Sequence, residues 1–312
     1  MKKFFSGVCT AMVTPMCRSV NKIDWDVFER NIERQIASGV DALCILGTTG
    51  EASTLSFDEK SAVVRFSLRV IRGRVPVVYG ISGNNPREIV KFGVYVRAIV
   101  KEYKENALRS GGVVAPAPMV GVLLTAPYYN KCTQDGAYLH FKNISRSVGL
   151  PMIVYNIPTR VGMNIEPTTL AKISRLKNVV GVKDSCGNIT KITQAVKTCK
   201  CAVYCGDDGI ALPCYAVGCA GVVSVASNLY PKETRAIWSA YRRSAVKMAG
   251  RLFRAEMKRY EILFCEVNPI PIKYAMHING LCAPNVRPPL TVLSSDSIIK
   301  HGFYKLFGGA DV

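Results

Sequence analysis

The chain has 312 residues, and 49% of them are hydrophobic, which is enough for one large domain or two ordinary ones. Charged residues make up 20% of the chain and no low-complexity tract occurs, so the composition excludes a largely disordered protein. The formal net charge is +19, but the cations are scattered through apolar, periodic segments instead of forming tracts. This distribution favours anionic small-molecule substrates over nucleic-acid or membrane binding.

The twelve cysteines form no CxxC pair, and many lie in apolar runs: Cys9, Cys44, Cys205 and Cys219. This spacing fits neither a disulfide framework nor a metal site, so we expect buried thiols in a reducing compartment, the cytoplasm. The segment 2–12 begins with two cations and an apolar stretch, but Thr14-Pro15 interrupts it before any convincing cleavage site. We therefore expect a first strand there and no signal peptide. No apolar run reaches the roughly 20 residues of a membrane span.

Eight short, β-rich apolar runs alternate with amphipathic stretches up to Val225. The runs are Gly7–Val13, Ala42–Gly47, Val75–Gly80, Gly121–Ala126, Met152–Asn156, Val179–Asp184, Ala202–Gly206 and Gly221–Val225. They are apolar on both faces, as parallel strands buried between a core and a helix layer are. The stretches between them include Trp25–Ser38, Phe57–Ile71, Thr168–Leu176 and Gly209–Val217. This alternation predicts an α/β fold with right-handed crossovers.

Two α/β architectures fit this order, an open doubly wound sheet and a closed barrel. Eight strands in about 225 residues suit a (β/α)8 TIM barrel, whose usual length is about 250 residues. A dinucleotide-binding sheet carries a glycine-rich fingerprint after its first strand, whereas the first run here leads into Thr14-Pro15-Met16. No P-loop pattern occurs either. We therefore predict that residues 1–228 form a barrel.

Beyond Ser227 the sequence changes to helical patterns without further strands. We predict one helix in each of Pro231–Met248, Gly250–Cys265 and Pro269–Ile278, followed by a last helix and a short tail. These helices are expected to form a C-terminal helical extension, residues 229–312, packed on the barrel.

Residues 106–120 interrupt the regular alternation of strands and helices. They contain Gly111-Gly112 and Pro116-Ala117-Pro118, and they are long for a helix-to-strand connection. Such connections lie on the barrel face opposite the active site. We therefore interpret the segment as a tolerated surface insertion.

Lys183 is the most informative residue, because the reactive groups of a barrel stand at the carboxyl ends of its strands. It directly follows the apolar run Val179–Val182, so we expect its side chain at the mouth of the barrel. Desolvation there disfavours the ammonium, and a neutral amine can condense with a ketone to give an imine. Taken alone, a lysine that merely ends a strand at the surface is the more common case. No histidine falls at a strand end.

Other strand ends carry polar residues with chemistry of their own. Thr48-Thr49 lie between glycines, where hydroxyls and backbone N–H groups can hold a carboxylate or form an ordinary capped turn. Tyr155 can relay a proton through its phenol. Arg160 suits planar capture of a second carboxylate, with a solvated loop cation as the alternative. For Tyr128 and Tyr129, aromatic packing is the simpler interpretation of either residue alone.

The motifs extend along nearly the whole chain, apart from residues 106–120. They are Gly47-Thr48-Thr49-Gly50-Glu51, Tyr128-Tyr129-Asn130-Lys131, Tyr155-Asn156-Ile157-Pro158-Thr159-Arg160, Gly181-Val182-Lys183-Asp184, Gly206-Asp207-Asp208 and Gly221-Val222-Val223-Ser224-Val225. Together they resemble the dihydrodipicolinate synthase and N-acetylneuraminate lyase superfamily. The paired threonines, Arg160 and the segment 268–273 (Asn-Pro-Ile-Pro-Ile-Lys) favour the dihydrodipicolinate synthase family within it.

The resemblance implies a 4-hydroxy-tetrahydrodipicolinate synthase activity that joins pyruvate to L-aspartate 4-semialdehyde in diaminopimelate and lysine synthesis. It implies no metal and no cofactor. Lys183 would form the Schiff base with pyruvate. Thr48, Tyr155 and Tyr129 would relay protons, with Tyr129 reaching in from a neighbouring subunit of a homotetramer built from tight dimers.

The resemblance also implies which residues bind the two substrates. Thr49, Gly206 and the backbone at Val223 would line the pyruvate pocket. Arg160 would bind the carboxylate of the second substrate.

A regulatory lysine site is a further implication of the resemblance. The matching positions are Ala52, Ser53, Phe57, Lys60, Asn84, Glu88 and Tyr128. Lysine-sensitive relatives often carry imidazoles where Phe57 and Lys60 stand, and the cation of Lys60 would repel the ammonium of a lysine ligand. We therefore predict weak or absent inhibition by lysine.

Two other functions compete with this interpretation. A sister class I pyruvate aldolase, acting on N-acetylneuraminate or a 2-keto-3-deoxy sugar acid, would need hydroxyl partners where Arg160 stands. A non-catalytic basic binding protein on the same barrel would have no use for Lys183, Tyr155 and Thr48.

Overall fold

The computed structural model describes residues 3–109 and 118–308. Eight parallel strands close into a barrel in chain order, with β1 beside β8. The strands are β1 Gly7–Ala11, β2 Ala42–Ile45, β3 Val77–Gly80, β4 Val120–Thr125, β5 Met152–Asn156, β6 Val179–Asp184, β7 Ala202–Cys205 and β8 Gly221–Ser224. All their residues except Val180 are buried, because both faces of the barrel wall are covered. The predicted (β/α)8 TIM barrel is confirmed.

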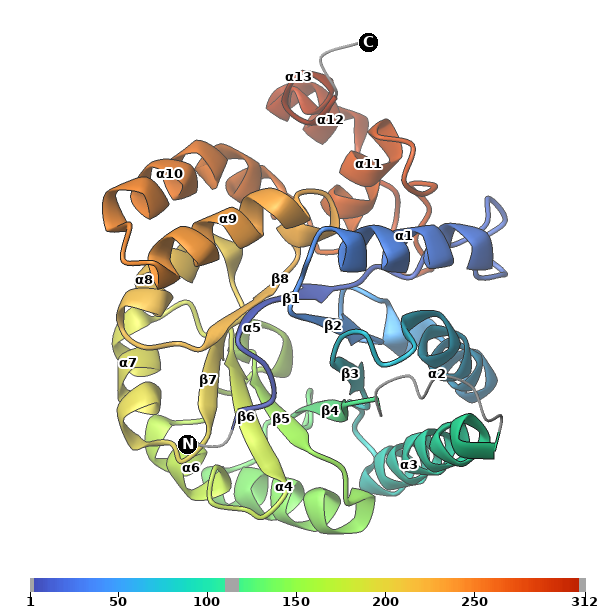
Figure 1. Ribbon diagram of the computed structural model, residues 1–312, viewed down its shortest axis with the longest axis vertical. Coiled ribbons are helices and arrows are strands. Elements are labelled where there is room, and N and C mark those ends of the chain that lie inside the picture. Colours follow the sequence, from blue (N-terminus) through green and yellow to red (C-terminus); the bar gives the residue numbers. More distant parts are fainter. Residues whose placement is uncertain (1–2, 110–117, 309–312) are drawn as a thin grey trace.

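Helices surround the strand cylinder (Figure 1). They are α1 Trp25–Ala37, α2 Phe57–Ile71, α3 Pro86–Arg109, α4 Gln134–Val148, α6 Pro167–Ile173, α7 Ile189–Thr198, α8 Ala211–Ala216 and α9 Pro231–Arg242. Between strands and helices lie the short helix α5 Pro158–Val161 and the 3₁₀ helices η1 Ala52–Thr54, η2 Asp208–Ile210 and η3 Ala226–Asn228.

Helix α2 illustrates how local sequence sets an element's ends. The Ser56 hydroxyl accepts from the Glu59 N–H, and the Glu59 carboxylate accepts from the Ser56 N–H, so both orphan donors of the first turn are satisfied. Arg72 adopts a left-handed conformation (φ 51°) and ends the helix. Between these ends, apolar residues at helical spacing, such as Val64 and Leu68, are buried against the barrel.

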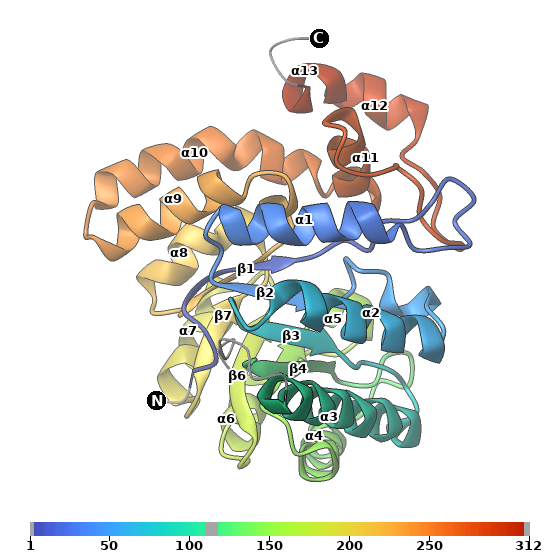
Figure 2. The same cartoon turned by 45° about the vertical axis from the view of Figure 1, so that its right-hand side comes forward.

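The helix that follows β8, α9, packs against β1 and so closes the ring of barrel helices. The barrel therefore extends beyond residue 228, the end of the range predicted from the sequence. The chain continues through α10 Val246–Ile262, α11 Ile270–Ile278, α12 Ser295–His301 and α13 Phe303–Phe307. Helix α10 lies beside α9, whereas α11, α12 and α13 extend outward beyond α1 (Figures 1 and 2). The predicted C-terminal helical extension is thus present.

One predicted helix boundary in this region is wrong. The sequence suggested a break near Ala249, but the chain turns at Arg243–Ala245, between α9 and α10. Ser244 adopts φ 61°, a left-handed conformation that ends the helical path. Ala249 and Phe253 are both buried on one face of α10, so the helix gains by running through this region uninterrupted.

The predicted insertion at residues 106–120 is only partly described. Residues 106–109 continue α3, and Val120 begins β4. The middle of the segment, residues 110–117, lies outside the described residues.

Eight of the twelve cysteines are buried, in keeping with the prediction that they act as small apolar side chains. Within residues 3–109 and 118–308, no disulfide forms and no cluster of histidine, cysteine and acidic side chains could hold a metal ion. Across the same ranges no helix is both long and apolar enough to cross a bilayer.

Candidate active site

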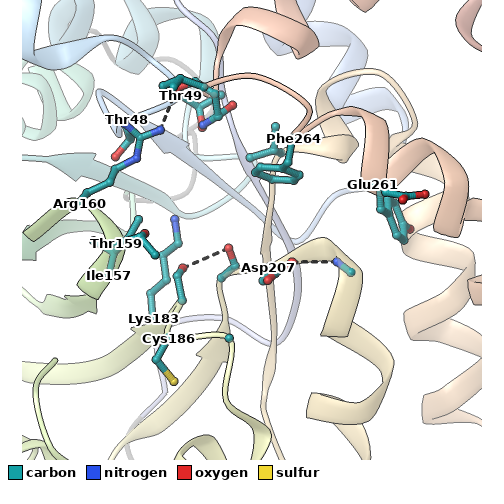
Figure 3. Close-up of a pocket in the computed structure, with 18 of the residues that line it drawn as sticks. Thr48, Thr49, Ile157, Thr159, Arg160, Lys183, Cys186, Asp207, Glu261 and Phe264 are labelled. Atoms are coloured by element: carbon teal, nitrogen blue, oxygen red, sulfur yellow. Dashed lines mark hydrogen bonds between the residues drawn. The ribbon is translucent and has the colours of Figure 1, made fainter. Parts of the chain in front are cut away.

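A cavity of about 920 Å³ opens at the carboxyl ends of the strands (Figure 3). Its lining combines barrel loops with the segment between α10 and α11. The barrel contributes Thr48, Thr49, Tyr155, Ile157, Thr159, Arg160, Lys183, Ser185, Cys186, Gly187, Gly206, Asp207, Gly209 and Val225. The extension contributes Met257, Tyr260, Glu261, Phe264, Cys265, Glu266, Val267 and Asn268.

Lys183 lies near the end of β6 and reaches into this cavity (Figure 3). The residue is only 6% exposed, and its Nζ is 3.9 Å from the centroid of the Tyr155 ring on neighbouring β5. Gly206 is required beside it, because a Cβ at that position would stand 2.9 Å from Lys183 Cε and 2.0 Å from Ser185 Oγ. The lysine is thus enclosed on the β5 and β7 sides and open only towards the cavity.

The charge state of Lys183 differs from the prediction. Burial disfavours its ammonium, as expected, but the electrostatic interactions with Tyr155, Cys44 and Cys9 together favour it more strongly, and the pKa of Lys183 is raised from its usual value of 10.5. The ring of Tyr155 also stabilises a cation held over its face. The predicted lowering of the Lys183 pKa by burial is therefore wrong. Lys183 must lose a proton before its nitrogen can attack a ketone.

The thiols that flank Lys183 inside the barrel are not the groups that take this proton at neutral pH. Burial raises the pKa of both Cys9 and Cys44 above 9.0, so both are neutral thiols near pH 7. Both side chains are almost wholly buried. Tyr155 is therefore the neighbour best placed to exchange a proton with Lys183.

Asn268 links two residues predicted to bind different substrates. Its side-chain Nδ2 donates to Thr49 Oγ1 (3.0 Å), and its backbone oxygen accepts from Arg160 Nη2 (2.9 Å). The guanidinium of Arg160 is thereby held over the cavity, on the same side as Thr48 and Thr49 (Figure 3). A planar cation in this position can hold a carboxylate by two parallel hydrogen bonds.

Buried carboxylates fix the strand ends on both sides of Lys183. Asp184 Oδ1 accepts from Asn156 Nδ2 (3.1 Å) and from the Cys186 N–H (2.9 Å). Asp208 Oδ2 accepts from the N–H groups of Val225 (2.9 Å) and Ala226 (3.0 Å). Burial raises the pKa of both Asp184 and Asp208. These carboxylates therefore stabilise the loops around Lys183.

A buried ion pair joins the threonine loop to the C-terminal extension. Lys273 on α11 pairs with Glu51, and both side chains are at most 1% exposed. The other Glu51 oxygen accepts from the Arg287 N–H (2.8 Å), and Lys273 also donates to Asn285 O (2.8 Å). Because only Gly50 separates Glu51 from Thr48-Thr49, this network helps to position the threonine loop.

The cavity brings together six of the eight residues predicted to act on substrate: Thr48, Thr49, Tyr155, Arg160, Lys183 and Gly206. Two others are not among its lining residues. Val223 is buried within β8, and Val225 lines the cavity two residues later. Tyr129 is 88% exposed.

We did not predict from the sequence that the C-terminal extension forms one wall of the active-site cavity. Tyr260, Phe264 and Val267 line the cavity, yet nothing in their spacing distinguishes them from other residues of a surface helix and loop. Asn268 belonged to a recognised motif, but its bond to Thr49 joins residues 219 positions apart. Such pairing depends on the path of the whole chain and leaves no local signal.

A second, smaller cavity of about 220 Å³ contains most of the predicted regulatory residues. Ala52, Ser53, Lys60, Asn84, Glu88 and Tyr128 all line it. Phe57 does not, and its ring packs against Phe92 (centroids 5.6 Å apart). Lys60 stands in the cavity wall with its Nζ 5.7 Å from the Phe92 ring, and burial lowers the pKa of Lys60. A cation is thus part of this cavity, as the sequence suggested.

A closed (β/α)8 barrel with a buried lysine near the end of its sixth strand is the architecture of Schiff-base-forming carbon–carbon lyases. The profile of the dihydrodipicolinate synthetase family matches residues 4–99 and 104–301. The chain therefore belongs to this family, as predicted.

Individual relatives agree over nearly the whole length. The 4-hydroxy-tetrahydrodipicolinate synthase of Alkaliphilus oremlandii is 36% identical over 92% of this chain and 93% of its own. The solved dihydrodipicolinate synthase from Aquifex aeolicus is 33% identical, with a TM-score of 0.87 over 97% of this chain and 98% of that one. The chloride-inhibited enzyme from Acinetobacter baumannii, solved with pyruvate, is also 33% identical, with a TM-score of 0.87 over 96% and 98%. These likenesses support the predicted synthase activity over that of the sister aldolases.

Proposed function

We propose that this chain condenses pyruvate with L-aspartate 4-semialdehyde to give 4-hydroxy-tetrahydrodipicolinate, with Lys183 as the imine-forming nucleophile. The observation that carries the proposal is the buried Nζ of Lys183, 3.9 Å from the Tyr155 ring centroid, in a cavity that also holds Arg160. The relatives' names give the product and, for one solved structure, bound pyruvate, and the family resemblance implies aspartate 4-semialdehyde as the second substrate. The cavity supplies candidate groups for each step.

The first step joins Lys183 to the C2 carbonyl of pyruvate. The amine adds to the carbonyl carbon, and the carbonyl oxygen leaves as water with two protons that were on the nitrogen. We propose that Tyr155 and Thr48 carry these protons between nitrogen and oxygen, and that Thr49 and the open face at Gly206 accommodate the pyruvate carboxylate.

The second step forms the carbon–carbon bond. The protonated imine lets C3 of pyruvate lose a proton, and the resulting enamine attacks the aldehyde carbon of the second substrate, whose oxygen becomes the hydroxyl. Arg160 holds the substrate's carboxylate during this step. The substrate's amino nitrogen then attacks C2 and releases Lys183, which closes the ring.

We propose further that the active unit is a cytoplasmic homotetramer built from dimers, in which Tyr129 completes the relay of a neighbouring subunit. The support comes from Tyr129 itself. The residue is 88% exposed, and its backbone adopts a left-handed conformation (φ 70°). A strained backbone that presents an exposed aromatic ring is typical of a functional contact.

The proposal is tested by offering purified enzyme pyruvate with either aspartate 4-semialdehyde or N-acetylmannosamine, and following pyruvate consumption and the product by mass spectrometry. We expect turnover with the semialdehyde only. Faster turnover with the sugar would assign the chain to the sister aldolases.

A further inference from the structure

A carboxylate without an assigned role stands in the active-site cavity. Asp207 follows Gly206 at the end of β7 and lines the cavity together with Lys183 and Arg160 (Figure 3). Its Oδ1 accepts from the Gly209 N–H (3.0 Å) and so caps η2. No cationic side chain within the described residues forms a salt bridge with Asp207.

The other two acids of the cavity wall are already engaged. Glu261 is 69% exposed and pairs with Lys258 (3.2 Å) on the outside of α10. Glu266 accepts from the hydroxyl of Ser294 (2.5 Å). Asp207 therefore differs from both, since it offers its charge to the cavity itself.

The position of Asp207 relative to the nucleophile suggests what it binds. Strand β6, which carries Lys183, lies between β5 and β7. Arg160 lies on α5, the short helix after β5, and Asp207 follows the end of β7 by two residues. The segments after β5 and β7 thus bring a cation and an anion into the same cavity as the nucleophile. An amino-acid head group, which combines a carboxylate with an ammonium group, can form a charge-assisted hydrogen bond with each of them.

We propose that Asp207 binds the α-ammonium group of the second substrate while Arg160 binds its α-carboxylate. This inference rests on the proposed function and deepens it. Both charges of aspartate 4-semialdehyde are carried by one carbon, two bonds from the aldehyde carbon that the enamine attacks. A neutral sugar aldehyde offers no group to Asp207, so the Arg160–Asp207 pair selects amino-acid aldehydes.

The test is the substitution Asp207→Asn, measured with two aldehydes. Asparagine keeps an oxygen that can accept from the Gly209 N–H, so the cap of η2 survives and only the charge is lost. With aspartate 4-semialdehyde we expect KM to rise about tenfold or more, the usual scale for losing a hydrogen bond between charged groups. With succinic semialdehyde, the same chain without the amino group, and for KM of pyruvate, we expect changes within about twofold.

Asp135→Asn provides the matched control, because it makes the same chemical change at an exposed residue of α4 that does not line the cavity, and it is expected to leave all three values unchanged. Borohydride trapping of pyruvate by Asp207→Asn checks that the site is folded. An equal penalty for both aldehydes, or none for either, overturns the role of Asp207. If the wild-type enzyme does not use aspartate 4-semialdehyde at all, the proposed function fails and this inference fails with it.

Discussion

The charge state of Lys183 depends on opposing effects that come from several strands of the barrel. Burial at 6% exposure disfavours its charge, whereas Tyr155, with its ring centroid 3.9 Å away, and the side chains of Cys44 and Cys9 favour it, and the pKa of Lys183 is raised. The place of Lys183 at the mouth could be predicted, because a barrel fixes where strands end. The sign of its pKa shift could not, because it depends on neighbours from β1, β2 and β5 that only the closed barrel brings together.

The raised pKa of Lys183 predicts how imine formation depends on pH. A group with a folded-state pKa above 10.5 is protonated at neutral pH, and the reactive neutral fraction grows as the pH rises. Between pH 7 and 9 we expect the initial rate of imine formation to rise, by up to about tenfold per pH unit. Timed borohydride quenching with pyruvate measures this rate, with enzyme integrity at each pH checked by circular dichroism. A flat profile over this range would mean that the amine is already neutral.

At the scale of elements, the strands and most helices could be predicted from local sequence. The contribution of the C-terminal extension to the cavity wall could not. Runs that are apolar on both faces predict buried parallel strands, and every predicted run overlaps one, with ends that agree to within two residues. The break between α9 and α10 was misplaced. Left-handed residues at helix ends are usually glycine or asparagine, so Ser244 did not indicate one. Likewise, only the folded chain shows that the segment before α11 covers the cavity and that Lys273 reaches Glu51.

The buried ion pair between Glu51, in the loop after β2, and Lys273, on α11, leads to a prediction about stability. Lys273→Met leaves the carboxylate of Glu51 buried without its cation, which we expect to cost about 3–5 kcal/mol of the free energy of unfolding. Adding Glu51→Gln to this variant should restore a large part of the loss, because no charge is then buried. Urea denaturation of the two variants and the wild type measures both values, with Lys258→Met as a control for an exposed ion pair. Equal stability of wild type and Lys273→Met contradicts the account.

The second cavity leads to a regulatory prediction. Lys60 lines the cavity whose other residues are, by the family resemblance, the predicted lysine site, and a lysine ligand would bring a further cation beside it. We expect millimolar lysine to leave the activity of the wild-type enzyme essentially unchanged. Replacing the cation, in Lys60→Gln, should increase any response to lysine. Strong inhibition of the wild type at micromolar lysine in a steady-state assay would refute this view.

At the scale of the whole molecule, the barrel places five of the predicted catalytic and substrate groups in a single cavity with Lys183 and leaves Tyr129 outside it. The family resemblance, and not any pattern in the residues, suggested that Tyr129 serves another subunit.

Mixing two inactive variants tests the shared site. If Tyr129 acts in a neighbour's cavity, a mixed dimer of Lys183→Ala and Tyr129→Phe chains contains one intact site, with Lys183 from one chain and Tyr129 from the other. We expect activity to reappear when the two variants are unfolded and refolded together. Each variant refolded alone is the control. No gain on mixing, although mixed oligomers are shown by native mass spectrometry, would place Tyr129 in its own chain's site or outside catalysis.

The most direct test concerns the amine on which the whole reaction depends. Purified enzyme is incubated with pyruvate, reduced with borohydride and mapped by peptide mass spectrometry. We expect a carboxyethyl adduct on Lys183 and none in the Lys183→Ala protein, with the neighbouring Lys191 unmodified in both. An adduct on a different lysine, or no adduct in an enzyme that still consumes pyruvate with aspartate 4-semialdehyde, would contradict the account.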